Sequence, residues 1–247
     1  MKTTERHELK HNELSDALTA TYSSFEQNRK NLTIGLGVVL AALAIWGSYA
    51  FYTSQREARA GAMLAEALVV TEAQVVPTIA PAPGQPAPAP SPNSYPTEQA
   101  KLEAALPKLL AAADAYPKTD AGIAARYQAA GVLAQLGKST EARQRFQEVV
   151  ERDGRGVHGR MARLAVAEID VKAKQYDAAI KTLQELSLDT RGDIPVDAVL
   201  LQLAKAYADA GKKAEAQQAL LRVTTEFSTS PYAADAKKLL DALKAGA

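Results

Sequence analysis

The stretch "GKSTEARQRF" at residues 137–146 decides the fold, because two similar stretches follow it at a constant distance. They read "AKQYDAAIKTL" at 173–183 and "GKKAEAQQALL" at 211–221. Five sets of positions recur with a step of 37 residues: Tyr127, Leu164 and Leu201; Ala130, Ala167 and Ala204; Ala142, Ala179 and Ala216; Phe146, Leu183 and Leu220; Val149, Leu186 and Val223. A period of this length is typical of stacked helix pairs, since one pair can bury its apolar side only against its neighbours.

Each repeat has the pattern of a helix A, a turn and a helix B. In the repeat that shows it best, we predict helix A over 121–136 and helix B over 139–152. Gly137 suits the turn because glycine tolerates the left-handed backbone that often ends a helix. Gly211 holds the same position in the last repeat, whereas Lys174 replaces it in the middle one. The recurring alanines mark the places where helices A and B come closest.

The composition favours helix and excludes several classes of function. Aromatic residues make up 6% of the 247 residues, and Ala, Leu, Glu, Gln and Lys dominate the second half. The net charge is +1, from 29 basic and 28 acidic residues, so no strong field attracts nucleic acid. The absence of cysteine excludes disulfides and thiolate metal sites, and it fits either a reducing or an oxidising compartment. We therefore predict an all-α protein with almost no strand.

The repeat resembles that of the tetratricopeptide repeat (TPR) family. The family's pattern has a small residue in helix A, a glycine at the turn, an alanine early in helix B and a large apolar residue four positions later. Two repeats meet it fully, with Ala130, Gly137, Ala142 and Phe146, and with Ala204, Gly211, Ala216 and Leu220; the middle repeat keeps Ala167, Ala179 and Leu183. The family's usual period is about 34 residues, so a step of 37 implies longer turns, such as 189–195. The resemblance implies an α-solenoid of about four helix pairs that binds other proteins.

The first repeat is interrupted. One step before the second repeat, residues 105–117 fit a helix B, in which Pro107 is expected to kink or restart the helix. The repeat places the matching helix A near 77–96, but this stretch is Pro-rich and cannot form a helix. We place this helix A at 54–73 and interpret the Pro-rich stretch as an insertion. It serves as a spacer or, alternatively, as a ligand for a small recognition module. A last helix within 230–246 caps the repeats.

Residues 32–52 form an uncharged apolar run of 21 residues, long enough to cross about 30 Å of hydrocarbon as a helix. We predict a single transmembrane helix here, which divides the chain into a segment 1–31, the span, and a repeat domain 53–247. A cleaved signal peptide is a rival interpretation, but its apolar core would be shorter. A buried globular helix is the other rival, although so long an uncharged helix would need protein on every side.

Charges beside the span predict its orientation. Arg29 and Lys30 precede it, which places the N-terminus in the cytoplasm by the positive-inside rule, while Arg56 and Arg59 on the far side weigh against this assignment. The repeat domain then lies on the opposite side of the membrane, on a single-pass protein. Within 1–31 we expect a short amphipathic helix on the cytoplasmic side.

A stripe of small residues follows one side of the predicted span. It consists of Gly37, Ala41, Ala44 and Ser48, spaced by four, three and four residues. Such a stripe can admit a second helix closely, as in a homo-oligomer. The general abundance of glycine and alanine in membrane helices is the alternative explanation.

We find no arrangement of residues that indicates catalysis, a cofactor or a metal. His158 is the one histidine after the predicted span, and "DGRGVHGR" around it has the pattern of a turn between repeats rather than a phosphate loop. His7 and His11 lie four residues apart, but no Asp, Glu or Cys completes a metal site. We therefore predict that the protein is not an enzyme.

Partner binding is expected on the surface lined by the A helices. Counting from the core positions, the candidate lining residues are Tyr127, Gln135, Glu168, Lys172, Lys205 and Asp209. Their mixed charges favour polypeptide over polyanion as the partner. The alternative is that each belongs to an ordinary solvated helix face.

The whole layout is similar to that of the ancillary subunits of the bacterial Sec translocon. That resemblance implies a single-pass protein of the bacterial inner membrane with a periplasmic repeat domain. It further implies a scaffold or chaperone-like adaptor that passes emerging polypeptides to periplasmic chaperones. Two alternatives stay open: an envelope coordinator of cell division or cell-wall synthesis, and a regulatory subunit of a membrane enzyme.

Overall fold

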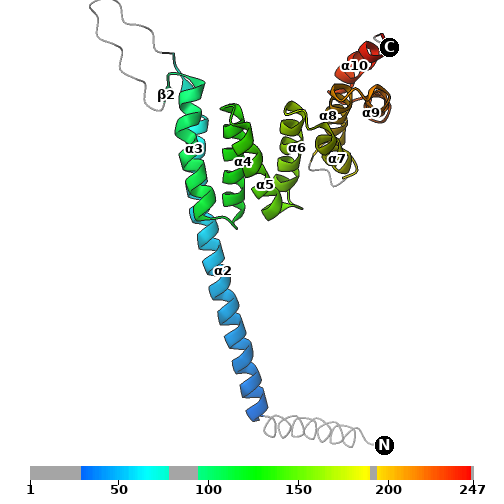
Figure 1. Ribbon diagram of the computed structural model, residues 1–247. Coiled ribbons are helices and arrows are strands. Elements are labelled where there is room, and N and C mark those ends of the chain that lie inside the picture. The colour runs from blue at the N-terminus through cyan, green and yellow to red at the C-terminus, as the bar shows by residue number, and fades with distance from the viewer. Residues whose placement is uncertain (1–28, 78–93, 190–193, 246–247) are drawn as a thin grey trace, which may run out of the picture. The chain divides into compact units, whose positions relative to one another are not determined.

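The computed structural model describes residues 29–77, 94–189 and 194–245. The chain divides into two compact units, residues 1–55 and 56–247. Over the described residues there are nine α-helices and two strands of two residues each (Figure 1). The first helix, α2 (Arg29–Thr71), begins in the first unit and ends in the second.

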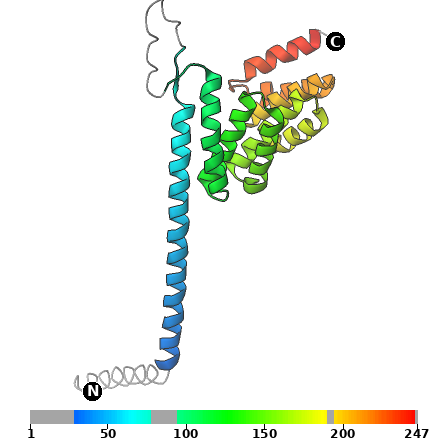
Figure 2. The same cartoon turned by 60° about the vertical axis from the view of Figure 1, so that its left-hand side comes forward.

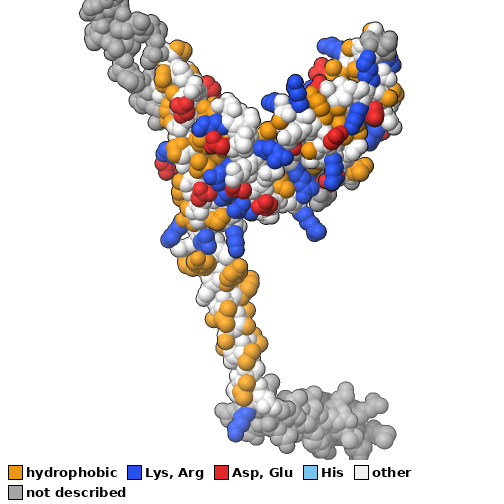
Figure 3. Space-filling view, viewed as in Figure 1, with side chains coloured by type: hydrophobic (Ala, Val, Ile, Leu, Met, Phe, Trp, Pro, Cys, Tyr) orange, Lys and Arg blue, Asp and Glu red, His pale blue; other side chains and the backbone are white. Residues whose placement is uncertain are grey.

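The first unit is described from residue 29 and consists of the first part of α2. Among the described residues, this helix holds the one segment long and apolar enough to cross a membrane. Its large apolar side chains, including Ile34, Leu40, Trp46 and Phe51, are exposed. Figure 3 shows hydrophobic side chains along this part of α2. A signal sequence near an N-terminus can also meet this criterion of length and composition, so membrane insertion stays a prediction. The amphipathic helix expected within 1–31 falls almost wholly outside the described residues.

The second unit is an α-solenoid. After the end of α2 come α3 (Glu98–Ala115), α4 (Asp120–Gln135), α5 (Ser139–Asp153), α6 (Val157–Lys172), α7 (Tyr176–Ser187), α8 (Val196–Asp209), α9 (Lys213–Glu226) and α10 (Ala233–Ala245). From α3 onward each helix packs against the next, and α6 also contacts α4 and α8 (Figures 1 and 2). We call α4, α6, α8 and α10 the A helices and their exposed side the A face; α3, α5, α7 and α9 are the B helices.

The recurring positions form the core, as predicted. Four of the five sets have at most 5% of their surface exposed: Ala130, Ala167 and Ala204; Ala142, Ala179 and Ala216; Phe146, Leu183 and Leu220; Val149, Leu186 and Val223. In the fifth set Leu201 is buried, while Tyr127 and Leu164 are half-buried. The sequence period therefore corresponds to the structural repeat.

The three turns between helices A and B have one geometry. Gly137, Lys174 and Gly211 have φ of 77°, 60° and 75°, the left-handed conformation. In the first turn the Lys138 amide donates to the Leu133 carbonyl over 2.9 Å and the Gly137 amide donates to the Ala134 carbonyl. The other two turns repeat both bonds, which together define a Schellman motif. Lys174 therefore adopts a backbone conformation that costs little only for glycine.

The first repeat is completed by the C-terminal part of α2, in which Ala60 and Ala67 are buried. Ala67 packs with Leu102 and Leu109 of α3. The Glu57 carboxylate accepts hydrogen bonds from the backbone amides of Asp120 (3.1 Å) and Ala121 (2.8 Å). A carboxylate is favourable there because the amides at a helix N-terminus lack partners within the helix.

One expectation about the first repeat needs correction, and parts of two others fall outside the described residues. Helix α3 continues without restarting at Pro107, which lies nine residues beyond its first residue. Strands β1 (Gln74–Val75) and β2 (Ser94–Tyr95) pair in parallel, so the end of the Pro-rich insertion forms a short strand. Residues 78–93 of the predicted insertion at 77–96, and residues 190–193 of the predicted turn at 189–195, lie outside the described residues.

We predict that Lys174→Gly stabilises the repeat domain by about 1 kcal/mol, because it relieves the left-handed strain at this turn. Gly137→Ala should destabilise by about the same amount. Its added Cβ meets no atom within 4 Å, so only the backbone conformation opposes it. Urea unfolding followed by helical circular dichroism measures both effects.

Lys138→Gly is the matched control, since the backbone of Lys138 has a φ of −83° and gains nothing from glycine. This substitution should lower the unfolding midpoint. A Lys174→Gly variant that is destabilised like the control would contradict the strained turn.

Candidate functional site

A hollow of about 320 Å³ lies between α6 and α8 on the A face. Its lining residues are Glu168, Val171, Lys172, Leu183, Gln202, Lys205 and Asp209. Four of the six predicted partner-binding residues, two from each helix, therefore meet in one depression. The buried Leu183 of α7 belongs to its floor.

A second hollow of about 400 Å³ adjoins the first, between α8 and α10. It shares Lys205 and Asp209 with the first hollow and is otherwise apolar. The remaining lining residues are Ala204, Ala208, Leu220, Leu239, Ala242 and Leu243. Lys205 and Asp209 thus form a charged ridge on α8 between a polar and an apolar depression.

The two hollows are the same structural feature, one repeat apart. Adding 37 to six of the seven lining residues of the first gives six of the eight lining residues of the second: Glu168 becomes Lys205, Val171 becomes Ala208, Lys172 becomes Asp209, Leu183 becomes Leu220, Gln202 becomes Leu239 and Lys205 becomes Ala242. The step reverses the charge at two positions. It also replaces polar by apolar side chains along the wall that α10 contributes. The A face therefore has two equivalent hollows, one lined largely by polar and charged side chains and the other largely by apolar side chains.

Glu168 is a half-buried acid in the first hollow. The Gln202 side-chain amide donates to its carboxylate over 3.3 Å. Burial raises the pKa of Glu168, and the ammonium groups of Lys172 and Lys205 offset part of this rise. A half-buried carboxylate between two lysines leaves the hollow without a strong net charge, which suits a polypeptide better than a polyanion.

The other two predicted residues lie outside both hollows. Tyr127 of α4 packs its ring edge-on against Phe146, with 5.4 Å between ring centroids, and lies 5.9 Å from the His158 ring. Burial, and then the charge of Glu168, raise the pKa of Tyr127. Gln135 is exposed near the end of α4. Tyr127 is therefore mainly a packing residue, in contact with Phe146 and His158.

The small-residue stripe and His158 line neither of the two hollows. The small-residue stripe of Gly37, Ala41, Ala44 and Ser48 lies on α2 and is exposed, so its role in helix packing stays a prediction. His158 lies in the first turn of α6, whereas the sequence pattern placed it in the turn between repeats. Among the described residues, no group of three or more His, Cys, Asp or Glu could hold a metal ion.

Several lining residues were missed by sequence reasoning, namely Val171, Gln202, Leu239 and Leu243. Two of them could have been found from the repeat or from a neighbouring predicted residue. A step of 37 from Gln202 leads to Leu239, and Val171 precedes the predicted Lys172. Treating the last helix as an A helix rather than only as a solvating cap would have identified the apolar wall.

Residues 23–223 match the tetratricopeptide repeat-like domain family, and the chain belongs to this family. No curated protein matches it. Among solved structures, the chain is similar to residues 41 to the end of MamA from Desulfovibrio magneticus RS-1. The identity is 21% and the TM-score 0.49, over 59% of this chain and 75% of that chain. A tetratricopeptide repeat protein from Parabacteroides merdae ATCC 43184 is 14% identical with a TM-score of 0.49, over 59% of this chain and 55% of the other.

We predict that Glu168→Gln stabilises the protein relative to the native chain near neutral pH, and that this difference shrinks in acid. A raised folded pKa means that the native carboxyl contributes stability below its unfolded pKa, near 4.5, and loses it as the pH rises through the folded value. The glutamine carries no such penalty.

Urea unfolding of both proteins at about pH 4 and about pH 7 measures the difference. Glu185→Gln, which removes an exposed carboxylate on α7, is the control for the loss of one surface charge. A native carboxyl that gains stability over the variant as the pH rises would contradict the effect of burial.

Proposed function

We propose that this protein is a membrane-anchored adaptor that binds polypeptide segments on the A face of its repeat domain. The family and the helical repeats support a protein-binding scaffold. The observation that carries the proposal is the pair of adjoining hollows on the A face, one polar and one apolar. An extended segment can place a polar side chain beside Glu168 and an apolar one against Leu239.

The charged ridge on α8 also indicates which chemical groups a bound polypeptide segment would carry. Lys205 and Asp209 carry opposite charges and lie one helical turn apart. Together they can bind hydrogen-bond acceptors and hydrogen-bond donors of the partner. The apolar hollow between α8 and α10 rewards an aliphatic or aromatic side chain by removing it from water. Emerging or unfolded polypeptides display both kinds of group, which favours a chaperone-like role.

The membrane part of the proposal rests on the apolar first part of α2. Its exposed side chains at 34–52 need an apolar surrounding, and Arg29 and Lys30 precede the segment. We place the N-terminus in the cytoplasm and the repeat domain in the periplasm of a bacterial inner membrane. The partners are then the Sec translocon and periplasmic chaperones.

We predict that a photo-reactive amino acid in place of Lys205 crosslinks to translocon subunits, periplasmic chaperones or translocating chains in living cells. Lys181 is the matched control, because it is an exposed lysine on the B helix α7. Crosslinks should be absent or much weaker there. Equal capture from both positions, or capture of a division or cell-wall protein from position 205, would contradict the adaptor proposal.

Topology is tested by a single introduced thiol, since the chain has no cysteine of its own. Lys244→Cys, on the exposed side of α10, should react with a membrane-impermeant maleimide added to spheroplasts. A thiol that reacts only after the membrane is permeabilised would place the repeat domain in the cytoplasm.

A further inference from the structure

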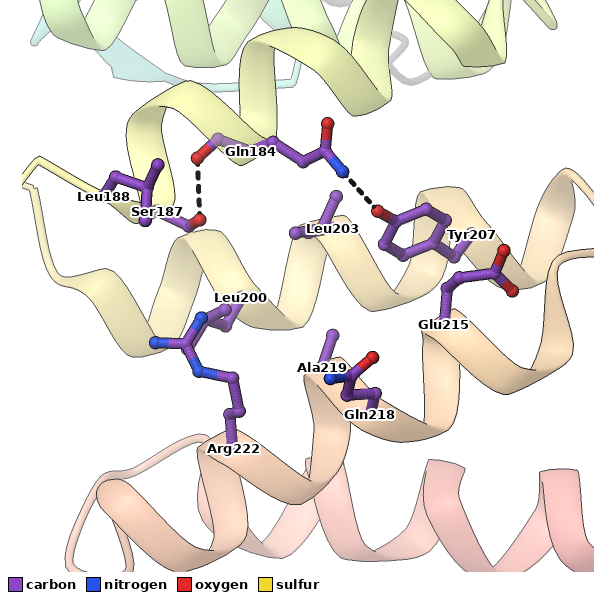
Figure 4. A pocket seen from close by; sticks show the side chains of 10 residues that line it. All are labelled: Gln184, Ser187, Leu188, Leu200, Leu203, Tyr207, Glu215, Gln218, Ala219 and Arg222. Atoms are coloured by element: carbon purple, nitrogen blue, oxygen red, sulfur yellow. Dashed lines mark hydrogen bonds between the residues drawn. The ribbon is translucent and has the colours of Figure 1, made fainter.

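A third hollow, of about 400 Å³, lies on the side of the B helices, between α7 and α9 and over α8 (Figure 4). We call it the B-side hollow. Its lining residues are Gln184, Ser187, Leu188, Leu200, Leu203, Tyr207, Glu215, Gln218, Ala219 and Arg222. The floor is apolar, whereas the rim carries amides and two opposite charges.

The preceding repeat provides an internal comparison, because it has a hollow of about 420 Å³ at the same place. A step of 37 relates all seven of its lining residues to the B-side hollow: Gln147 to Gln184, Val150 to Ser187, Glu151 to Leu188, Arg163 to Leu200, Val166 to Leu203, Thr182 to Ala219 and Glu185 to Arg222. The shape therefore belongs to the repeat. The chemistry is particular to each copy.

The step replaces two charged lining residues by leucine. Leu200 replaces Arg163, and Leu188 replaces Glu151. Leu188 is 76% exposed, the highest value for a large apolar residue among the described residues of the second unit. A single exposed leucine is ordinary, but this one borders an apolar depression, an arrangement typical of an interaction site.

The charges on the rim are arranged so that this surface is complementary to a second copy of itself. Glu215 and Arg222 lie on α9, seven residues apart, which is two turns or about 10.5 Å along the helix. Figure 4 shows them at opposite ends of the hollow, with Gln218 between them. A two-fold axis over Gln218 would bring Glu215 of one copy to Arg222 of the other, twice. The Arg222 guanidinium also pairs with Glu226, through Nε over 2.9 Å and Nη2 over 3.1 Å.

We propose that a second copy of this chain docks on the B-side hollow, with the two α9 helices antiparallel. The two copies then contribute the same surface, as in most two-fold dimers. Leu188 lies at the Arg222 end of its own hollow, so the two-fold axis carries it to the Tyr207 end of the partner's hollow. There it is shielded from water. The proposal is independent of membrane location and of polypeptide binding on the A face.

The preceding hollow cannot dimerise in the same way. Its counterparts of Glu215, Gln218 and Arg222 are Ala178, Lys181 and Glu185. These residues offer no acid and base in exchangeable positions, and two copies would place like charges near one another. Lys181 is therefore a matched control position, on the equivalent helix at the equivalent height.

The test uses the full chain, purified in a mild detergent, with one introduced cysteine. Gln218→Cys places a thiol next to the two-fold axis, so a short bifunctional thiol reagent should link two copies. Lys181→Cys should give at most background dimer. Strong crosslinking of Gln218→Cys alone supports the interface. Equal yields from both variants, or none from Gln218→Cys, overturn it, as does a Gln218→Cys adduct in isolated membranes that contains another protein and no homodimer.

Charge reversal tests the pairing in a second way. In the Gln218→Cys background, Glu215→Arg places arginines opposite each other and should raise the dimer dissociation constant about tenfold or more. Adding Arg222→Glu exchanges both charges and should restore crosslinking. Helical circular dichroism and the melting temperature show whether each variant is folded. Folded variants whose crosslinking ignores the charges would overturn the two-fold arrangement.

Discussion

The structure depends on one constraint, which is that a helix pair with two apolar sides can bury both only between neighbouring pairs. The alanines at 142, 179 and 216 meet this constraint locally, because a small side chain lets helix B approach helix A. All three are completely buried. The larger residues one turn further, Phe146, Leu183 and Leu220, then fill the space between helices. Stability is consequently distributed along the stack rather than gathered in one central core.

Strict repetition of the backbone explains why hollows recur on both sides of the stack. The left-handed turns at 137, 174 and 211 fix the angle between helices A and B three times over. Each repeat therefore presents the same depressions, and single side chains decide what each depression can bind. Glu168 and Lys205 occupy equivalent positions and have opposite charges. At another pair of equivalent positions, the charged Arg163 of one repeat is replaced by the apolar Leu200 of the next. Function can change in one repeat while the fold stays constant.

Much of the fold could be predicted, because periodicity is recorded directly in the spacing of residues. The buried charges could not. Arg126 is buried and pairs with Asp114 and Glu148 of the neighbouring helices, and Asp170 is buried and accepts from Arg143 over 2.6 Å. Such pairs join residues that are distant in sequence, and a charged residue in a helix is otherwise expected to be solvated.

The candidate site was predicted in part for the same reason. Glu168, Lys172, Lys205 and Asp209 follow from counting along helix A, and the structure brings them together. Tyr127 fits the same count, but its large ring packs against Phe146 in the core. The apolar wall of the second hollow escaped prediction because α10 has no helix B after it in the described chain, so its part in the repeat pattern was not evident.

The central claim is that the A face binds polypeptide. Its most direct test is hydrogen exchange of the full chain, with and without a reduced and alkylated protein that stays unfolded, used as the probe. The account predicts slower exchange in α6, α8 and α10 when the probe is bound. Slower exchange confined to α5 and α7, or none anywhere in the repeat domain at saturating probe, would contradict it.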